Sequence, residues 1–339
     1  MSLFLSVIVS VYNVEKYIAE CLDSILSQEG VDFEVICVND ASPDRSIEIL
    51  QDYAKRDSRV RVVNLEKNGG VSHARNVGMS LAQGEYLLLI DGDDKLEAGF
   101  ISSLYELIRK TNVDRVGCSY RYYYQNNPAR KDVFMHPQVT SNGELWAYCS
   151  PQTIGRVHYG ANVIIRRSIV EKHQLKFSEN IRFAEDLQFH YICFPHCEKV
   201  AILSAPPFYV YRKHSESATC TLHTGNAAKV LDYIEICRSV MQNWQSKGLW
   251  EDYRIAWLKM LFMCVRNIRK YAPHSSQAQV TRDVCEMLNQ TGVFDLAADR
   301  NYLSKKEWAL LRQLYLGKSG MTLSYYWKRM RNKLKFLFK

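Results

Sequence analysis

Short apolar runs alternate with helical patterns over the first 90 residues of the chain. The apolar and β-branched runs are typical of strands buried on both faces. Between them, apolar residues recur three and four positions apart, as they do in amphipathic helices. Four strands are predicted in this way: Leu5–Val11, Phe33–Val38, Val60–Asn64 and Tyr86–Ile90. Their alternation with helices predicts right-handed βαβ crossovers and a doubly wound α/β sheet.

The rest of the chain is less regular. Residues 113–124, rich in tyrosine, predict one further strand, and residues 125–150 predict an irregular polar loop. Another strand is predicted at Val163–Ile165. Farther along, the spacing of apolar residues becomes helical. We therefore expect an α/β domain over residues 1–222 and a helical region over residues 223–339.

Three acidic residues follow the fourth strand. Asp91, Asp93 and Asp94 come directly after its apolar run, so they lie at the strand's carboxyl end, where open α/β sheets bind ligands. Three crowded carboxylates repel one another unless a cation or hydrogen-bond donors compensate their charge. The alternative is an acidic surface turn, but such turns seldom follow a fully apolar strand. The cluster favours a hard divalent cation, Mg²⁺ or Mn²⁺.

The composition is that of a packed globular protein, with 47% hydrophobic and 12% aromatic residues. The net charge of +8 favours phosphate-bearing ligands or an anionic membrane. No apolar run approaches the ~18 residues that span a bilayer. The chain starts with an apolar strand that no basic segment precedes, so we expect no signal peptide. Ten scattered cysteines are typical of reduced thiols in a cytosolic core.

One cysteine cluster has the residue types of a metal site. His190, Cys193, His196 and Cys197 lie within eight positions of one another. No second pair stands elsewhere at the spacing of a zinc site. Core packing is therefore favoured over structural zinc.

Five elements of the sequence, in this order, resemble those of the inverting glycosyltransferases of family 2, which have the GT-A fold. They are Val9–Asn13, Val38–Asp44, Asn68–Gly78, Asp91–Asp94 and Glu185–Asp186. Each is weak alone, but together with the strand pattern they are specific. The resemblance covers residues 2–219. Ser10 replaces a common proline and Gly92 a common serine, and neither change removes a group that the reaction needs.

The resemblance implies a Rossmann-like mixed sheet with helices on both faces, followed by a C-terminal helical extension. It also implies a metal-dependent, inverting transfer of a sugar from a nucleotide-diphosphate sugar to a hydroxyl group. The cation neutralises the leaving diphosphate as a Lewis acid. Asp93 is then the metal ligand, Asp91 lies at the ribose or a metal-bound water, and Asp94 supports them. Capping of the following helix is an equal alternative for Asp94.

Asp186 is the predicted general base. In an inverting displacement, the acceptor hydroxyl loses its proton on the sugar face opposite the diphosphate. A positioned carboxylate typically contributes ~10²–10⁴-fold to such a step. Glu185 is then expected to orient the acceptor or a loop. The alternative is that the acidic pair only stabilises a helix N-terminus, where negative charge is favoured. The order of the motifs favours the catalytic role.

Several residues at the other strand ends are candidates for nucleotide binding. The resemblance implies that Asp40 accepts the imide N–H of uracil, which favours a UDP-sugar donor. An Asx turn is the alternative, although Asp44 fits that turn better. Arg75 suits a phosphate or the base edge, or else it is a surface residue of a helix. Tyr12 and Asn13 can contact the base, and Asn13 also fits a helix N-cap.

A basic segment follows the last predicted strand of the α/β domain. Arg212 and Ser217 resemble the pair that holds the diphosphate in related enzymes. His214 is a further donor or metal ligand. A basic loop on the surface is the alternative for all three.

The C-terminal segment combines apolar and basic residues. Apolar residues recur at helical spacing between lysines and arginines: Trp327, Met330, Leu334, Leu337 and Phe338. Such a helix can lie on an anionic membrane, or it can pack on the body of the protein. The first option predicts a cytoplasmic protein held peripherally at the inner face of the cytoplasmic membrane. Membrane contact suits a glycan or lipid-linked glycan acceptor in lipopolysaccharide, capsule or O-antigen synthesis. We expect no nucleic-acid partner.

Other activities fit the sequence less well. A phosphatase of the haloacid dehalogenase type carries its nucleophile on an early strand, followed by Thr or Val, whereas Asp93 precedes another Asp. A nicotinamide oxidoreductase needs a glycine-rich turn after its first strand, where this chain has Val11-Tyr-Asn-Val14. A sugar nucleotidyltransferase would carry a Gly-rich loop with Arg and Lys there. A non-catalytic carbohydrate-binding or scaffold protein is the alternative from a different class.

Overall fold

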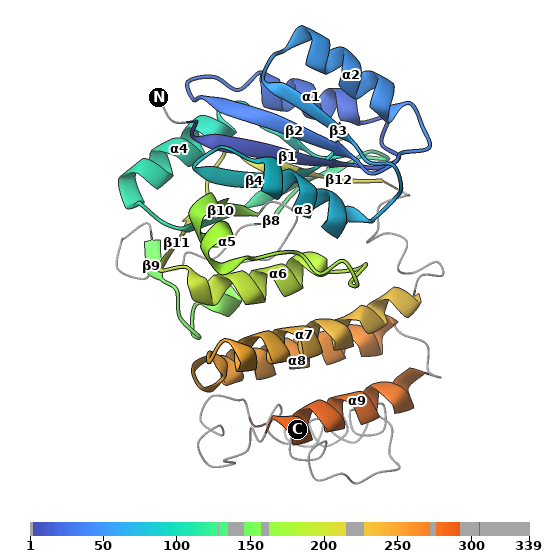
Figure 1. Ribbon diagram of the computed structural model, residues 1–339, viewed down its shortest axis with the longest axis vertical. Coiled ribbons are helices and arrows are strands. Elements are labelled where there is room, and N and C mark those ends of the chain that lie inside the picture. The colour runs from blue at the N-terminus through green and yellow to red at the C-terminus, as the bar shows by residue number, and fades with distance from the viewer. Residues whose placement is uncertain are drawn as a thin grey trace. The chain divides into compact units, whose positions relative to one another are not determined.

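The computed structural model describes residues 3–127, 129–134, 146–156, 163–214, 227–271, 276–291 and 305. The chain divides into two compact units, residues 1–217 and residues 218–339. Each unit has its own secondary structure (Figure 1). The predicted domain boundary at residue 222 lies outside the described residues.

The first unit is organised around four parallel strands. β1 (Leu5–Val11), β2 (Phe33–Asn39), β3 (Val60–Asn64) and β4 (Tyr86–Asp91) pair in the order β3-β2-β1-β4. The four predicted strands are therefore confirmed, each to within one residue. β1 is central, and all of its residues are buried because strands flank both of its edges and helices cover both faces of the sheet.

The same sheet continues with strands of mixed direction. β10 (Ile164–Arg166) runs antiparallel to both β4 and β6 (Arg115–Cys118). β11 (Lys199–Leu203) is parallel to β6, and β9 (Trp146–Tyr148) is antiparallel to β11. The sheet is therefore mixed, as the resemblance implies.

A second, smaller sheet has the order β5-β12-β7-β8. It contains β5 (Lys95–Leu96), β7 (Tyr120–Tyr124), β8 (Lys131–Phe134) and β12 (Tyr209–Lys213). β12 is parallel to β7, and the other two pairs are antiparallel. This sheet brings β12 alongside β5, in the segment that follows β4.

Two predictions for this region are wrong. The single strand predicted over residues 113–124 is two strands, β6 in the large sheet and β7 in the small one, separated at Ser119. β6 is fully buried, whereas every residue of β7 is half-buried, so the two halves suit different surroundings. The predicted loop over residues 125–150 contains β8, which pairs with the preceding strand β7, and β9, which pairs with the distant strand β11.

Helices lie on both faces of the large sheet (Figure 1). The unit contains α1 (Ile18–Leu26), α2 (Ser46–Arg56), α3 (Val71–Leu81), α4 (Phe100–Thr111), α5 (Arg167–His173) and α6 (Glu185–Cys193). Alternate residues of β1, such as Val7 and Val9, share one core with apolar residues of α1, α2 and α4. Ile8 points to the opposite face, where it lies against Gly78 of α3.

The described part of the second unit is helical, in agreement with the pattern of its sequence. A 3₁₀ segment (Ala227–Leu231) precedes α7 (Asp232–Ser246), α8 (Trp250–Tyr271) and α9 (Gln277–Gln290). The indole of Trp257 is fully buried and donates a hydrogen bond to the carbonyl of Cys237 at 2.8 Å, which ties α8 to α7. Among the described residues, no helix combines the length and hydropathy that crossing a membrane requires.

Candidate active site

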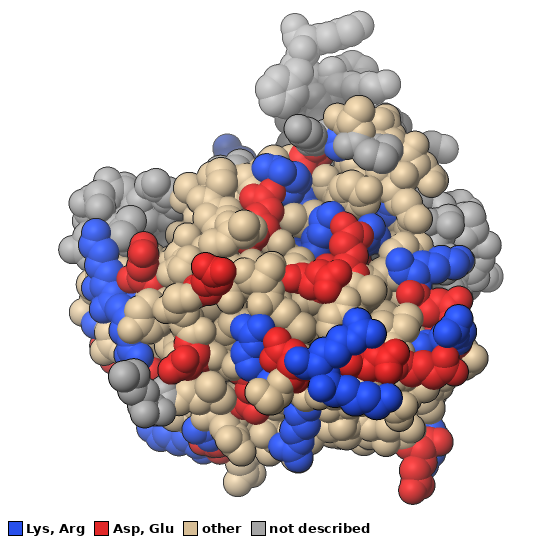
Figure 2. All heavy atoms as spheres, turned by 90° about the horizontal axis from the view of Figure 1, so that it is seen from above, with Lys and Arg blue, Asp and Glu red and all other residues tan. Residues whose placement is uncertain are grey.

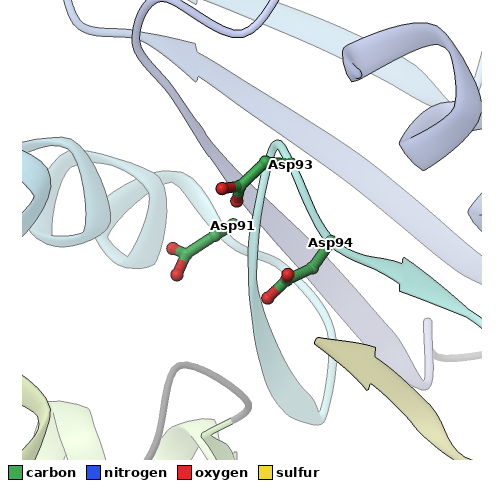
Figure 3. Close-up of side chains that lie close together, drawn as sticks. All are labelled: Asp91, Asp93 and Asp94. Carbon is green, nitrogen blue, oxygen red and sulfur yellow. The ribbon is translucent and has the colours of Figure 1, made fainter. Parts of the chain in front are cut away.

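Three aspartates lie together where β4 ends and the chain turns toward β5. Asp91 is the last residue of β4, and Asp93 and Asp94 follow in the turn. Figure 3 shows the three side chains close together, and one oxygen from each lies within 4.8 Å of the other two. The structure thus brings together the three carboxylates that the sequence places after the fourth strand.

Asp91 is held by two donors. Ser10 Oγ of β1 donates to Asp91 Oδ1 at 2.9 Å, and Arg75 Nη2 of α3 donates to the same oxygen at 2.8 Å. Arg75 Nη1 donates to Glu185 Oε1 at 2.7 Å. Arg75 is buried, which opposes its charge, but Asp91 and Glu185 outweigh this effect and raise the pKa of Arg75. Arg75 therefore connects the aspartate cluster to the start of α6.

Asp94 is the most buried of the three aspartates. Its Oδ2 accepts the hydroxyl of Tyr209 at 2.5 Å, and its Oδ1 accepts the backbone N–H of Arg212 at 2.8 Å. Burial and repulsion from Asp93 and Asp91 raise the pKa of Asp94, against the effect of these two donors. The alternative of a helix cap is wrong, since α4 begins after Gly99 and receives no side-chain cap. Asp94 instead joins the turn to β12.

Asp93 contacts the end of β12. Its Oδ2 lies 2.9 Å from Nε2 of His214, and its backbone carbonyl accepts Nε–H of Arg212 at 2.7 Å. Both Arg212 and His214 are buried, so the alternative of a basic surface loop is wrong for these two residues. Ser217, predicted beside them, lies outside the described residues.

This donor set fits a hard divalent cation. Carboxylate oxygens are the ligands that Mg²⁺ and Mn²⁺ prefer. Asp94 is the most buried of the three and each of its oxygens already accepts a protein hydrogen bond, so the more accessible Asp91 and Asp93 are better placed for the ion. His214 stands beside Asp93 as a third group.

Asp186 lies in the first turn of α6, which begins at Glu185 as predicted. Ala184, directly before the helix, has a φ of 58°, a left-handed conformation that is uncommon for a residue with a side chain. Burial, followed by repulsion from Glu185, raises the pKa of Asp186 to about 7, against the attraction of Arg75. Asp186 is thus a half-buried carboxylate that titrates near neutral pH.

Asp40 closes the glycine turn that precedes α3. Its Oδ1 accepts the N–H of Gly69 at 2.7 Å, and its Oδ2 accepts the N–H of Gly70 at 2.8 Å. The predicted alternative, a cap on the next helix, belongs to Asp44, whose Oδ1 accepts the N–H of Ser46 at 3.1 Å. Each oxygen of Asp40 has a second lone pair, so the contact with uracil stays a prediction.

Tyr12 and Asn13 follow β1 at the same edge of the sheet. The side chain of Tyr12 is 50% exposed, as a stacking partner for a base would have to be. Asn13 has a φ of 56°, and its N–H donates to Ser42 Oγ at 3.2 Å. A cap by Asn13 is wrong, because α1 begins only at Ile18 and receives no side-chain cap. Base contacts of these two residues stay predictions.

The His–Cys cluster makes contacts within the protein core. His190 Nε2 lies 2.9 Å from the carbonyl of Ile154, and Arg115 Nη1 lies 2.8 Å from Cys193 Sγ. Cys197 Sγ contacts the carbonyl of Cys193 at 3.6 Å. These contacts fit the packing role that the sequence favours. The cysteines of the described residues are free thiols.

Two residues that fix the aspartate cluster, Ser10 and Tyr209, were not predicted from the sequence as part of the site. Ser10 is a polar residue inside a fully buried strand, and that exception was a signal available in the sequence. Tyr209 gave no such signal, since its contact with Asp94 spans 115 positions of the chain.

Comparison with protein families gives a match to the model described as glycosyl transferase family 2, over residues 6–174. Among curated proteins, the chain is similar to the uncharacterized glycosyltransferase EpsJ of Bacillus subtilis, with 40% identity over 220 residues. That match covers 63% of this chain and 62% of the relative, so the chain spans about three fifths of the relative's length.

Solved structures show the same fold. S. aureus TarS, residues 1–349 in complex with UDP, matches with a TM-score of 0.69 and 21% identity, over 92% of this chain and 87% of that one. The mannosyltransferase PcManGT of Pyrobaculum calidifontis, in complex with GDP-Man and Mn²⁺, matches with a TM-score of 0.51 and 15% identity, over 94% and 87% of the two chains. The GT-A fold expected from the sequence is thus confirmed.

Proposed function

Because the chain belongs to glycosyl transferase family 2, we propose that it is an inverting glycosyltransferase that moves a sugar from a nucleotide-diphosphate sugar to a hydroxyl group. One observation carries this proposal beyond the family. Arg75 holds Asp91 of the aspartate cluster and Glu185, the neighbour of Asp186, with two terminal nitrogens of one guanidinium. A candidate metal site and a candidate base therefore stand at one sheet edge.

Asp186 suits the role of general base. A base works best when its pKa lies near the operating pH, because it is then both deprotonated and sufficiently basic. Burial raises the pKa of Asp186 to about 7, which meets that condition at neutral pH. In this proposal Asp186 takes the proton of the acceptor hydroxyl, and Glu185 is a positioning residue held by Arg75.

Asp91 and Asp93 are the proposed holders of Mg²⁺ or Mn²⁺, with His214 beside them. The bound cation would neutralise charge on the leaving diphosphate. Arg75 keeps Asp91 in place, and β12 keeps Asp93 and Asp94 in place. The complex of PcManGT with GDP-Man and Mn²⁺ supports a metal in this fold.

The proposed donor is a UDP-sugar. Complexes of TarS with UDP and with UDP-GlcNAc support this choice, and Asp40 is the residue proposed to accept the imide N–H of uracil. Arg212 and Ser217 are proposed to hold the diphosphate. Nε and Nη2 of Arg212 already donate to Asp93 and Glu20, so this role would use Nη1. For the acceptor we propose a hydroxyl of a glycan or lipid-linked glycan in cell-surface polysaccharide synthesis.

Sugar transfer with purified protein tests the proposal. UDP-sugars are screened with Mn²⁺ and oligosaccharide acceptors, and both released UDP and the glycosylated product are measured. Asp186→Asn is expected to lower transfer by ~10²–10⁴-fold, while UDP binding by calorimetry stays within about twofold. A non-catalytic carbohydrate-binding protein would bind saccharide without any UDP release, and full transfer by Asp186→Asn would contradict the assigned base.

A further inference from the structure

The side chain of Arg212 is enclosed next to the aspartate cluster. Only 5% of it is exposed. Its guanidinium carbon lies 5.1 Å from the centre of the Tyr17 ring and 5.0 Å from that of the Tyr123 ring, within the range of cation–π attraction. Tyr17 precedes α1, and Tyr123 belongs to β7, so two distant segments hold this guanidinium.

Arg212 holds the turn that carries the predicted metal ligand. Its Nε–H donates to the carbonyl of Asp93 at 2.7 Å, and its backbone N–H donates to Asp94 Oδ1 at 2.8 Å. Together with the hydroxyl of Tyr209 on Asp94 Oδ2, these bonds attach the turn to β12 at three points. The bond from Nε is the one that the Arg212 guanidinium makes, so the guanidinium helps to fix the backbone from which the Asp93 carboxylate projects.

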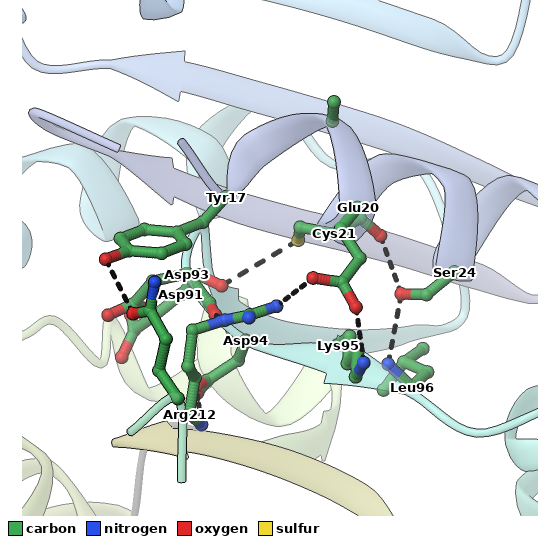
Figure 4. A network of polar contacts seen from close by, with 12 residues as sticks. Tyr17, Glu20, Cys21, Ser24, Asp91, Asp93, Asp94, Lys95, Leu96 and Arg212 are labelled. Atoms are coloured by element: carbon green, nitrogen blue, oxygen red, sulfur yellow. Dashed lines mark hydrogen bonds and ion pairs between the residues drawn. The ribbon is translucent and has the colours of Figure 1, made fainter. Parts of the chain in front are cut away.

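Glu20 of α1 fixes the far side of that guanidinium. Its Oε2 accepts Arg212 Nη2, and its Oε1 accepts Lys95 Nζ, so one carboxylate joins α1 to both β12 and β5 (Figure 4). Among the ion pairs of the described residues, Glu20 provides the carboxylate that pairs with Arg212. Glu20 and Lys95 also line a hollow of about 590 Å³.

We propose that Glu20 is a positioning residue for the metal-binding turn: its carboxylate holds the Arg212 guanidinium against the backbone of Asp93 and thereby fixes the carboxylates that bind the cation. This inference rests on the proposed function, because it assumes that Asp91 and Asp93 bind the cation. Glu20 acts through Arg212 and touches neither the cation nor the substrate.

The burial of Arg212 decides how much Glu20 matters. The side chain of Glu20 is 48% exposed, and an ion pair between two such exposed groups contributes little. Arg212, however, is enclosed, so loss of Glu20 leaves a buried charge without its counter-ion. The guanidinium is then expected to move toward water and to release the carbonyl of Asp93. Residues that orient metal ligands in this indirect way typically contribute ~10–100-fold to metal affinity.

Direct Mn²⁺ binding tests the inference. Free Mn²⁺ is measured by electron paramagnetic resonance during titration of the full chain, with UDP present. We expect Glu20→Gln to raise the Mn²⁺ dissociation constant ~10–100-fold and to raise the Mn²⁺ concentration needed for half-maximal transfer in the same proportion. Lys95→Gln removes the other partner of Glu20 and is the matched control, expected to stay within about twofold of wild type.

Failure of this inference and failure of the proposed function give different results. Equal Mn²⁺ affinity of Glu20→Gln and wild type overturns the inference. Should Glu20→Gln not fold by circular dichroism, Glu20→Asp is used in its place, and the same comparison decides. Wild-type protein that binds neither Mn²⁺ nor UDP refutes the proposed function itself, whatever the variants do.

Discussion

Glu185 and Asp186 are adjacent acids in different electrostatic surroundings. Glu185 contacts the guanidinium of Arg75 directly, so its charge is compensated. The charge of Arg75 lowers the pKa of Asp186 without a direct contact. Burial and the charge of Glu185 outweigh this effect and raise that pKa to about 7. Glu185 is thus paired with Arg75, whereas the pKa of its neighbour Asp186 is raised. This division separates the positioning residue from the proposed base.

The pH dependence of transfer follows from the pKa of Asp186. The base acts only when deprotonated, so activity is present above the pKa of Asp186 and is lost as the pH falls through it. We expect kcat/KM to fall about tenfold for each pH unit below an apparent pKa of about 7. Initial rates between pH 5 and 9 check this. The residual rate of Asp186→Asn should not show this fall at low pH. A fall that persists in the variant would mean that another group titrates.

Arg75 is expected to stabilise the folded protein. Arg75→Met leaves Asp91 and Glu185 without their shared counter-ion, and breaking a buried pair in this way costs about 3–5 kcal/mol. Urea unfolding of the free protein measures the loss. Arg45→Met is the matched control, since Arg45 and Glu48 form a pair whose side chains are 77% and 63% exposed. Its free energy of unfolding is expected to stay close to that of wild type, because exposed ion pairs contribute little, and an equal loss in both variants would refute the argument.

At the scale of elements, the site depends on how closely α3 packs on the large sheet. α3 carries Arg75, and Gly78 one turn later faces β1 and β2. A Cβ atom at Gly78 would lie 2.3 Å from Cγ2 of Ile8 and 3.4 Å from Cγ2 of Val38. Glycine therefore permits the helix to come near enough for Arg75 to reach Asp91.

Replacement of Gly78 tests this packing. Gly78→Ala is expected to lower the free energy of unfolding by about 1–3 kcal/mol, because an added methyl group in a filled core forces the neighbouring atoms apart. It should also weaken transfer by displacing Arg75. Gly155→Ala is the control, as nothing lies within 4 Å of an added Cβ there. Thermal unfolding of both variants distinguishes overpacking from a general effect of replacing glycine, and unchanged stability of Gly78→Ala would contradict the close approach.

At the scale of the whole molecule, the net charge is +8. On the face shown in Figure 2, Lys and Arg side chains are interspersed with Asp and Glu. By contrast, the last 13 residues include Lys328, Arg329, Arg331, Lys333, Lys335 and Lys339. This segment lies outside the described residues, so its predicted amphipathic helix rests on the sequence alone.

Membrane binding through this tail is a prediction for the whole chain. Deletion of residues 327–339 is expected to shift the protein from the membrane fraction to the soluble one, because each basic residue near an anionic surface contributes about 1 kcal/mol. Co-sedimentation with phosphatidylserine liposomes measures this. Binding of the full chain should weaken at high salt and should be absent with neutral liposomes. Unchanged partition of the truncated chain would instead favour a tail that packs on the body.

The sequence by itself determined the local structure. The four parallel strands and the helices between them follow from the spacing of apolar residues along short segments. It also placed Asp91, Asp93 and Asp94 together, because they are neighbours in the chain. Where a strand divided between two sheets, as at Ser119, the local pattern was misleading, since only the partner strands decide which sheet each half joins.

Tertiary structure alone decided the partners of these residues. Arg75 meets Glu185 across 110 positions of the chain, Tyr209 meets Asp94 across 115, and Arg212 meets Glu20 across 192. No periodicity encodes such contacts, because they form only when packing buries the groups and removes the water that would otherwise solvate them. The same burial sets the pKa of Asp186 near 7. The candidate residues could therefore be predicted from the sequence. The pKa of Asp186 and the residues that hold the site in place could not.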